Sequence, residues 1–256
     1  MSEFEQPPPY VQYPRSNFQP SGEFDRPPGV YFDAIADAWE LVKRDLGTWI
    51  AMFLLSGIVG ILIAAPFHVV SAFVPGGQWI FGQPINPGPF AFANFIVTIG
   101  HCLAFPAYAG IYYAALKQIR GEPLEIGNVF RGFSHFVSLA GFGLLYNLLV
   151  SIACLLCGFP AFFAIGICTP CFLLIMDRGL GPIAAIKESV RVLGGQAWML
   201  GLFAVVALIA LALLGIAMCC VGMLITLPVW IVATTLHYHY FWPTQTTQPV
   251  VPPMEG

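Results

Sequence analysis

Apolar residues fill most of this chain in long stretches, and charged residues occur only in the shorter segments between them. No Asp, Glu, Lys or Arg occurs in residues 46–116, 132–176 or 192–254. A transmembrane helix needs about 20 consecutive apolar residues, so each stretch has room for two helices and a turn. The pattern therefore predicts an all-α polytopic membrane protein with six transmembrane helices in three hairpins. The expected spans are 48–72, 91–116, 135–156, 160–176, 197–217 and 219–240.

A shorter segment with helical periodicity precedes each predicted hairpin. In residues 30–46 the apolar positions recur at spacings of three and four, at Phe32, Ile35, Trp39, Val42 and Leu46. Residues 126–133 show a briefer version of the pattern. The third begins at Pro182, with an apolar face of Ile183, Ile186, Val190 and Leu193. Such amphipathic helices lie in the membrane interface, so we expect Trp39, Ile186 and Trp198 to be interfacial anchors on the cytoplasmic side.

Polar, Pro-rich segments flank this membrane domain. Residues 1–29 are rich in Pro, Gln and Ser, which predicts a disordered or extended tail. The membrane domain is expected at 30–242, followed by a short polar C-terminal tail at 243–256. Residues Pro7 to Tyr10 match the PPxY pattern that WW domains bind, although a solvated tail explains the same composition.

The composition and the position of the charges support a membrane location and predict its orientation. The chain is 58% hydrophobic and 9% charged, whereas a soluble domain has about 25% charged residues. Its net charge of −3 gives no reason to expect nucleic acid as a partner. All 10 Lys and Arg residues lie outside the loop at 74–89 and the turns near 158 and 218. By the positive-inside rule, both termini face the cytoplasm and these connections face outward across a bacterial inner membrane.

A stripe of polar residues runs along the second and third predicted spans. Asn94, Thr98 and His101 share one face of the second span, and Tyr146 and Asn147 lie on the third. Polar side chains at membrane depth usually face the interior of a helix bundle. The stripe therefore indicates either a polar cleft between the two spans or ordinary interhelical hydrogen bonding.

The cysteines have the sequence spacing of a zinc site, but the two pairs are expected at different depths in the membrane. Cys154-x-x-Cys157 is followed by Cys168-x-x-Cys171, and the turn at Pro160 separates the two pairs. At 1.5 Å per residue the pairs differ in depth by about 10 Å, too far for one ion. We expect thiols packed in the core, with no metal and no cofactor.

Residues 30–240 resemble a known group of membrane proteins. The resemblance is carried by Asp177-Arg178-Gly179, by Ala184 to Ser189 with Gly194-Gly195, by Ala34 to Trp39 with Lys43, and by Phe130 to Phe133. The chain is similar to uncharacterised bacterial six-span proteins, themselves similar to the membrane domain fused to some glycerophosphodiester phosphodiesterases. The resemblance implies a six-span fold. It implies no phosphodiesterase activity, because this chain lacks the hydrolase domain and its acidic metal ligands.

Two functions remain open on the sequence alone. No acid–base carboxylate pair or known catalytic motif occurs in the predicted spans, so we expect no enzyme. The first hypothesis is a non-enzymatic protein that organises lipid or partner proteins in the bilayer, with membrane lipids, another membrane protein or a second copy of itself as partners. The alternative is a transporter or channel for a small neutral or amphiphilic solute.

Overall fold

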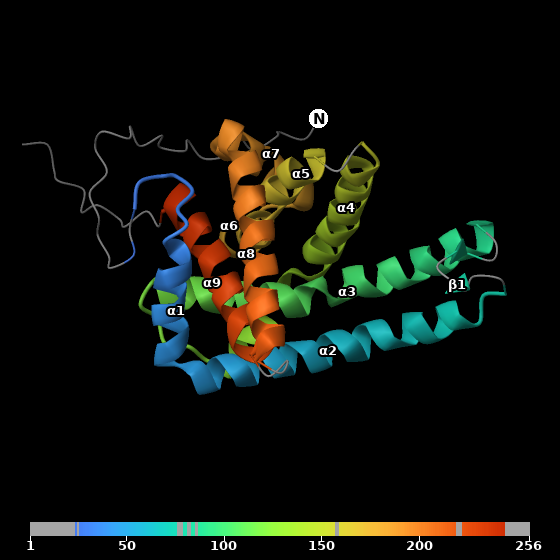
Figure 1. Ribbon diagram of the computed structural model, residues 1–256, viewed down its shortest axis with the longest axis horizontal. Helices are drawn as coiled ribbons and strands as arrows, with labels where there is room; N and C mark the ends of the chain where they lie inside the picture. The colour runs from blue at the N-terminus through green and yellow to red at the C-terminus, as the bar shows by residue number, and fades with distance from the viewer. Residues whose placement is uncertain are drawn as a thin grey trace, which may run out of the picture.

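Helices make up nearly all of the chain that the computed structural model describes (Figure 1). Residues 24 and 26–243 are described, apart from 76–78, 81–82, 85–86, 157–158 and 219–221. The predictions for the N-terminal tail, for most of the outer loop, for both outer turns and for the C-terminal tail therefore fall mainly outside the described residues. The elements are α1 (Ala34–Arg44), α2 (Leu46–Ala72), β1 (Trp79–Ile80), β2 (Gln83–Pro84), α3 (Pro87–Ile119), η2 (Ile126–His135), α4 (Phe136–Leu155), α5 (Phe159–Cys168), α6 (Cys171–Arg178), α7 (Pro182–Leu193), η3 (Gly194–Gln196), α8 (Ala197–Ala217) and α9 (Met223–Phe241).

Five helical segments of the described chain are long and apolar enough to cross a bilayer. They are Leu46–Ala72, Gly88–Ile119, Ile126–Ala153, Pro160–Arg178 and Pro182–Ala217. These segments match the first five predicted spans. The sixth predicted span, residues 219–240, corresponds to α9, which is not among the five. The all-helical class is confirmed with five helices of membrane length, and the count of six stays a prediction.

Helix α9 differs from those five because protein surrounds it. It packs against α1, α2, α3 and α8, and all side chains from Ile231 to Trp242 are buried. Near its C-terminal end, the residues from His237 to Tyr240 carry polar aromatic side chains. These side chains are packed inside the molecule, so they do not form an aromatic belt that faces the lipid headgroups.

The fourth candidate span consists of two helices rather than one. Helix α5 ends at Cys168 and α6 begins at Cys171, with Pro170 between them. Proline has no amide hydrogen, so Pro170 cannot donate to the carbonyl oxygen four residues earlier and the helix is interrupted there. The Ile165 carbonyl oxygen accepts hydrogen bonds from both the amide and the hydroxyl of Thr169, each at 2.8 Å. After the break, α6 buries Cys171 and the residues from Leu173 to Met176.

The helices are not arranged as three parallel hairpins. Helices α2 and α3 lie side by side and extend together away from the rest of the molecule (Figure 1). Helices α4 and α8 run in a clearly different direction in the same view. Helix α5 packs against both α4 and α8, so the second and third predicted hairpins share one interface.

Reciprocal glycine contacts bring the backbones of two helix pairs together. Where α5 crosses α8, Gly166 lies against the Ala197 carbonyl group and Gly201 lies against the Phe162 carbonyl group. A second reciprocal pair joins α3 to η2 through Gly110 and Gly132. A methyl group at any of these positions would overlap a backbone carbonyl group. Only glycine therefore permits these crossings.

A small-residue contact also joins α2 to α3. Ser56 and Gly60, four residues apart on α2, are both buried. The Ser56 hydroxyl donates to the Ala107 carbonyl oxygen of α3 at 2.9 Å, and Gly60 faces the Tyr108 side chain. Two small residues one turn apart thus let α3 approach α2 closely.

Helices occur at the three expected interfacial segments, and each of them buries one face against the rest of the bundle. Helix α1 buries mainly small residues and their neighbours: Ala34, Ala38, Leu41 and Val42. Helix α7 likewise buries Ala185, Glu188, Ser189 and Leu193. Small side chains fit these tight contacts, so larger apolar residues point outward. Trp39 is 43% exposed and Ile183 is 61% exposed.

Replacing Gly201 with alanine is expected to separate α5 from α8. The added methyl group meets a backbone carbonyl group that cannot rotate away, and overpacking of this kind costs about 1–3 kcal/mol. Thermal unfolding in lipid nanodiscs should show a lower Tm for Gly201→Ala. Gly57→Ala is the matched control, because it adds the same methyl group to another helix with nothing within 4 Å. Equal Tm values for the two variants would contradict the glycine contact.

Candidate functional site

The three charged segments of the chain meet around the C-terminal half of α9. Arg120, at the end of α3, donates from both terminal nitrogens to the Asp177 carboxylate of α6, at 2.6 and 2.8 Å. The Tyr238 hydroxyl of α9 donates to the same carboxylate at 2.9 Å. One carboxylate therefore links α3, α6 and α9.

This ion pair is mostly buried, and its geometry keeps both groups charged. A two-point Arg–carboxylate pair is the strongest form of the interaction. Burial alone would lower the pKa of Arg120, but the hydrogen bonds and the charge of Asp177 outweigh it and the pKa is raised. Removing both groups from water costs free energy that offsets much of their mutual attraction, so the pair adds little to the net free energy of folding. The pair still joins α3 to α6 at this point.

A glutamine joins the first charged segment to the second. The Gln118 side chain, next to last in α3, donates to the Asp45 carboxylate at 3.0 Å and accepts a hydrogen bond from the Trp49 indole at 3.0 Å. It also donates to the Leu41 carbonyl oxygen at 3.2 Å. The junction between α1 and α2 is thereby fixed against α3.

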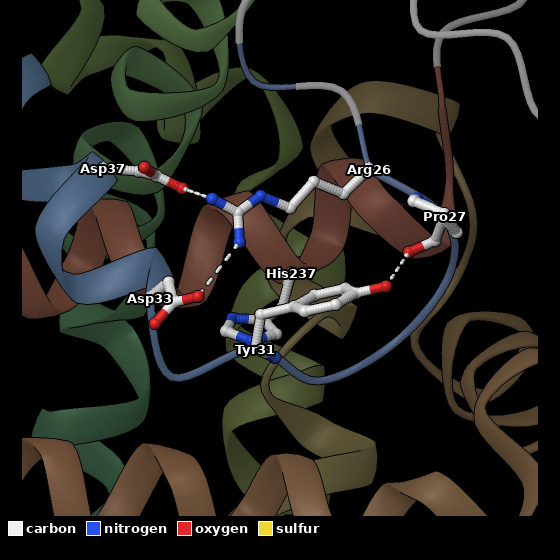
Figure 2. Close-up of polar contacts among 6 residues, drawn as sticks. All are labelled: Arg26, Pro27, Tyr31, Asp33, Asp37 and His237. Carbon is white, nitrogen blue, oxygen red and sulfur yellow. Dashed lines mark hydrogen bonds and ion pairs between the residues drawn. The ribbon is translucent and has the colours of Figure 1, made fainter.

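The segment before α1 is bound to α9 by a histidine. The Tyr31 amide donates to His237 Nε2 at 3.1 Å, and Figure 2 shows these two residues beside each other. On the other side of the ring, His237 Nδ1 lies 2.7 Å from the Ala233 carbonyl oxygen. A carbonyl oxygen can only accept, so Nδ1 carries the proton and Nε2 is free to accept from Tyr31. His237 is therefore neutral and serves as a structural acceptor.

Arg26 strengthens this attachment from the solvent side. Its guanidinium donates to Asp37 at 2.6 Å and lies 3.9 Å from Asp33, as Figure 2 shows. The same group lies over the rings of Tyr31 and Tyr240, with distances of 5.5 and 6.0 Å to the ring centroids. Residues 26–33 are thus held to the bundle by one arginine and one histidine.

The predicted polar stripe is divided among separate local contacts. The Asn94 amide and the Thr98 hydroxyl donate to carbonyl oxygens one turn earlier in their own helix, each at 2.9 Å. The Asn147 amide donates to the Gly143 carbonyl oxygen at 2.9 Å and contacts Cys102 Sγ across the α3–α4 interface at 3.6 Å. Each of these three side chains therefore donates a hydrogen bond to a carbonyl oxygen of its own helix.

The other two stripe residues lie in different environments. Tyr146 belongs to an aromatic cluster with Phe105 and Phe142, at centroid distances of 6.0 and 6.2 Å. His101 instead faces α2, where its Nε2 lies 3.2 Å from His68 Nε2. The stripe is therefore not one surface, and a polar cleft there stays a prediction.

The predicted interfacial anchors lie on the surface or close to it. Trp39 and Trp198 are each more than two-fifths exposed, and Ile186 is half-buried against the core. Phe130 of η2 and Ile183 of α7 are also exposed and were not singled out as anchors.

The cysteines that the structure describes fit the expectation of core packing. Cys102, Cys168 and Cys171 are free and buried, while Cys157, Cys219 and Cys220 lie outside the described residues. Within the described part of the chain, no group of three or more His, Cys, Asp or Glu side chains has the geometry to hold a metal ion.

No family model, curated protein or solved structure matches this chain. The resemblance to the membrane domain found with some phosphodiesterases therefore stays a prediction. The candidate site rests on geometry alone.

Replacing Asp177 with leucine is expected to destabilise the protein by about 3–5 kcal/mol, because it leaves Arg120 charged and unpaired in the interior. The double variant Arg120→Met/Asp177→Leu should be more stable than Asp177→Leu alone, since no buried charge remains. Thermal or denaturant unfolding in nanodiscs measures both. Glu122→Gln is the control: it removes the exposed partner of Lys117 and should cost less than about 1 kcal/mol. A cost for Asp177→Leu no larger than that of the control would contradict the role of the pair.

Proposed function

We propose that this chain is a non-enzymatic integral membrane protein that organises lipid or partner proteins in the cytoplasmic membrane, with both termini in the cytoplasm. Five apolar helices of membrane length support the membrane location. Large apolar side chains such as Leu62, Val137 and Leu213 are more than three-fifths exposed along these helices, as expected for a surface in contact with lipid.

The proposal rests mainly on the exposed apolar side chains of α1, η2 and α7. Trp39, Phe130 and Ile183 are 43%, 51% and 61% exposed. All three belong to the segments that also hold the charged residues, and Phe130 and Ile183 lie near the first residues of their candidate spans. An apolar side chain beside a cation suits the level of the lipid headgroups. Exposed cations lie on the same three elements: Lys43 and Arg44 on α1, Arg131 on η2, and Lys187 and Arg191 on α7.

The buried faces of α1, η2 and α7 fix these three elements to the rest of the bundle. Helix α1 packs against α9, η2 packs against α3 through the glycine pair, and α7 packs against α4 and α5. None of the three elements therefore has to leave the bundle to meet a bilayer or another protein. A fixed array of outward apolar residues is what a scaffold needs, because ordering the contact surface on binding costs little.

A transporter or channel for a small neutral or amphiphilic solute is the second candidate. It is supported by polar contacts that cross between helices, His68 with His101 and Asn147 with Cys102. Helix-distorting prolines lie inside α2 and α3, at Pro66 and Pro106. However, Asn94, Thr98 and Asn147 donate mainly to their own helices, which favours the scaffold.

Native mass spectrometry of the protein in lipid nanodiscs tests the choice between the two. The scaffold predicts that a co-isolated lipid or protein companion is lost in the triple variant Trp39→Ser/Phe130→Ser/Ile183→Ser. The protein itself should remain folded, because these side chains are exposed. Ala36→Ser, an exposed change on α1, is the control and should retain the companion.

The pair of variants His101→Ala and Asn147→Ala distinguishes the alternative. The scaffold predicts that both retain the companion. Loss of a bound small molecule in these two variants, with full retention in the triple variant, would contradict the scaffold and favour transport.

A further inference from the structure

Two histidines from different helices meet on the part of the α2–α3 pair that extends from the molecule. His68 of α2 and His101 of α3 approach through their Nε2 atoms at 3.2 Å, with ring centroids 5.2 Å apart. Both side chains are exposed. They take no part in the contacts around α9, so the packing of the core does not explain why they face each other.

The helix backbones around this pair are held in a fixed register. Gly100 lies against the Phe67 ring, where a Cβ atom would overlap it. Gly60 and Ser56 make the next contacts along α2, with Tyr108 and Ala107. The two imidazoles are therefore placed by backbone packing on one side of the pair rather than by their own interaction.

The distance between the two nitrogens matches the distance between two nitrogen ligands of one metal ion. A zinc–imidazole bond is about 2.0–2.1 Å, so two nitrogens on one tetrahedral ion lie about 3.3 Å apart. Two adjacent ligands of an octahedral ion lie about 2.9 Å apart at the same bond length. The observed 3.2 Å falls between these values. We propose that His68 and His101 form a two-histidine site for a divalent transition-metal ion of the zinc class, which clips α2 to α3.

The position of the pair along the helices places it within reach of water. His101 lies about 27 Å from the Ile119 end of α3, and His68 about 33 Å from the Leu46 end of α2, at 1.5 Å per residue. The hydrocarbon layer is about 30 Å thick. With the charged ends of both helices at one surface, the imidazoles reach the opposite surface. This step rests on the proposed crossing of the bilayer by α2 and α3.

The site would be an open one. In the described chain no third His, Cys, Asp or Glu joins the two imidazoles, so water fills the remaining coordination positions. Imidazole is a suitable ligand for zinc, copper and nickel. An ion held by two side chains and water exchanges readily with the solution. It binds only the assembled α2–α3 pair, because the unfolded chain does not hold the imidazoles together.

Zinc titration of the full chain in nanodiscs, purified with a tag that contains no histidine, tests the proposal. Isothermal titration calorimetry should show one Zn²⁺ ion bound per chain, and Zn²⁺ should raise the Tm. His68→Ala and His101→Ala should each weaken Zn²⁺ binding at least tenfold and abolish the rise in Tm. The variants His68→Gln and His101→Gln keep a polar side chain and should lose binding equally. His135→Ala, which removes an imidazole outside the pair, should bind like the wild type.

Two results would overturn the proposal. One is zinc binding that stays unchanged in the double variant His68→Ala/His101→Ala. The other is a wild-type chain that binds no Zn²⁺. Neither result bears on the scaffold, whose test uses co-isolated companions and residues of α1, η2 and α7. Conversely, loss of the companion in the scaffold variants would leave the Zn²⁺ titration unchanged.

Discussion

The structure depends on where its few charges are placed. A charged side chain in hydrocarbon costs about 3 kcal/mol or more, so the charges lie outside the long apolar stretches and all 10 Lys and Arg residues fall in three segments. Those segments then meet. Asp177 binds both Arg120 and Tyr238, Gln118 joins Asp45 to α3, and His237 accepts from the Tyr31 amide. One polar centre around α9 thus organises helices that are otherwise held by apolar contact and by glycine.

Packing around this centre accounts for the shape of the apolar part. Helix α9 is enclosed, and α5 can cross α8 closely because Gly166 and Gly201 leave their backbones uncovered. The inner faces of α1 and α7 use small residues for the same reason. Large apolar side chains are consequently left outside, both along the long helices and on the short ones. The proposed scaffold function follows from this division between a tightly packed interior and an apolar exterior.

The sequence predicts the helices well because its signals there are local. Charge-free stretches mark the long helices, Pro170 marks the break between α5 and α6, and Ser56 with Gly60 marks a close contact. Hydrophobicity alone cannot tell a helix facing lipid from a helix facing protein, so the enclosure of α9 was missed. The periodicity of the segments at α1 and α7 likewise indicates an apolar face, but it does not indicate which side chains meet the core, among them Ala38 and Ala185.

Contacts between distant residues were the least predictable part of the site. Asp177 and Arg120 each stand at the edge of an apolar stretch, and that position was the available signal that they might pair. His101 belongs to the predicted polar stripe, but its partner His68 lies 33 positions away on another helix. The central claim is that the three charged segments lie on the cytoplasmic side of the membrane, and labelling from each side of the membrane tests it most directly. Single cysteines replace Lys43, Arg131, Lys187 and Val74 in a cysteine-free background. An impermeant thiol reagent is then added to intact cells and to inverted vesicles. The account predicts labelling of the first three only from the cytoplasmic side and of Val74 only from the opposite side; labelling of any of the three charged segments from the outer side would contradict it.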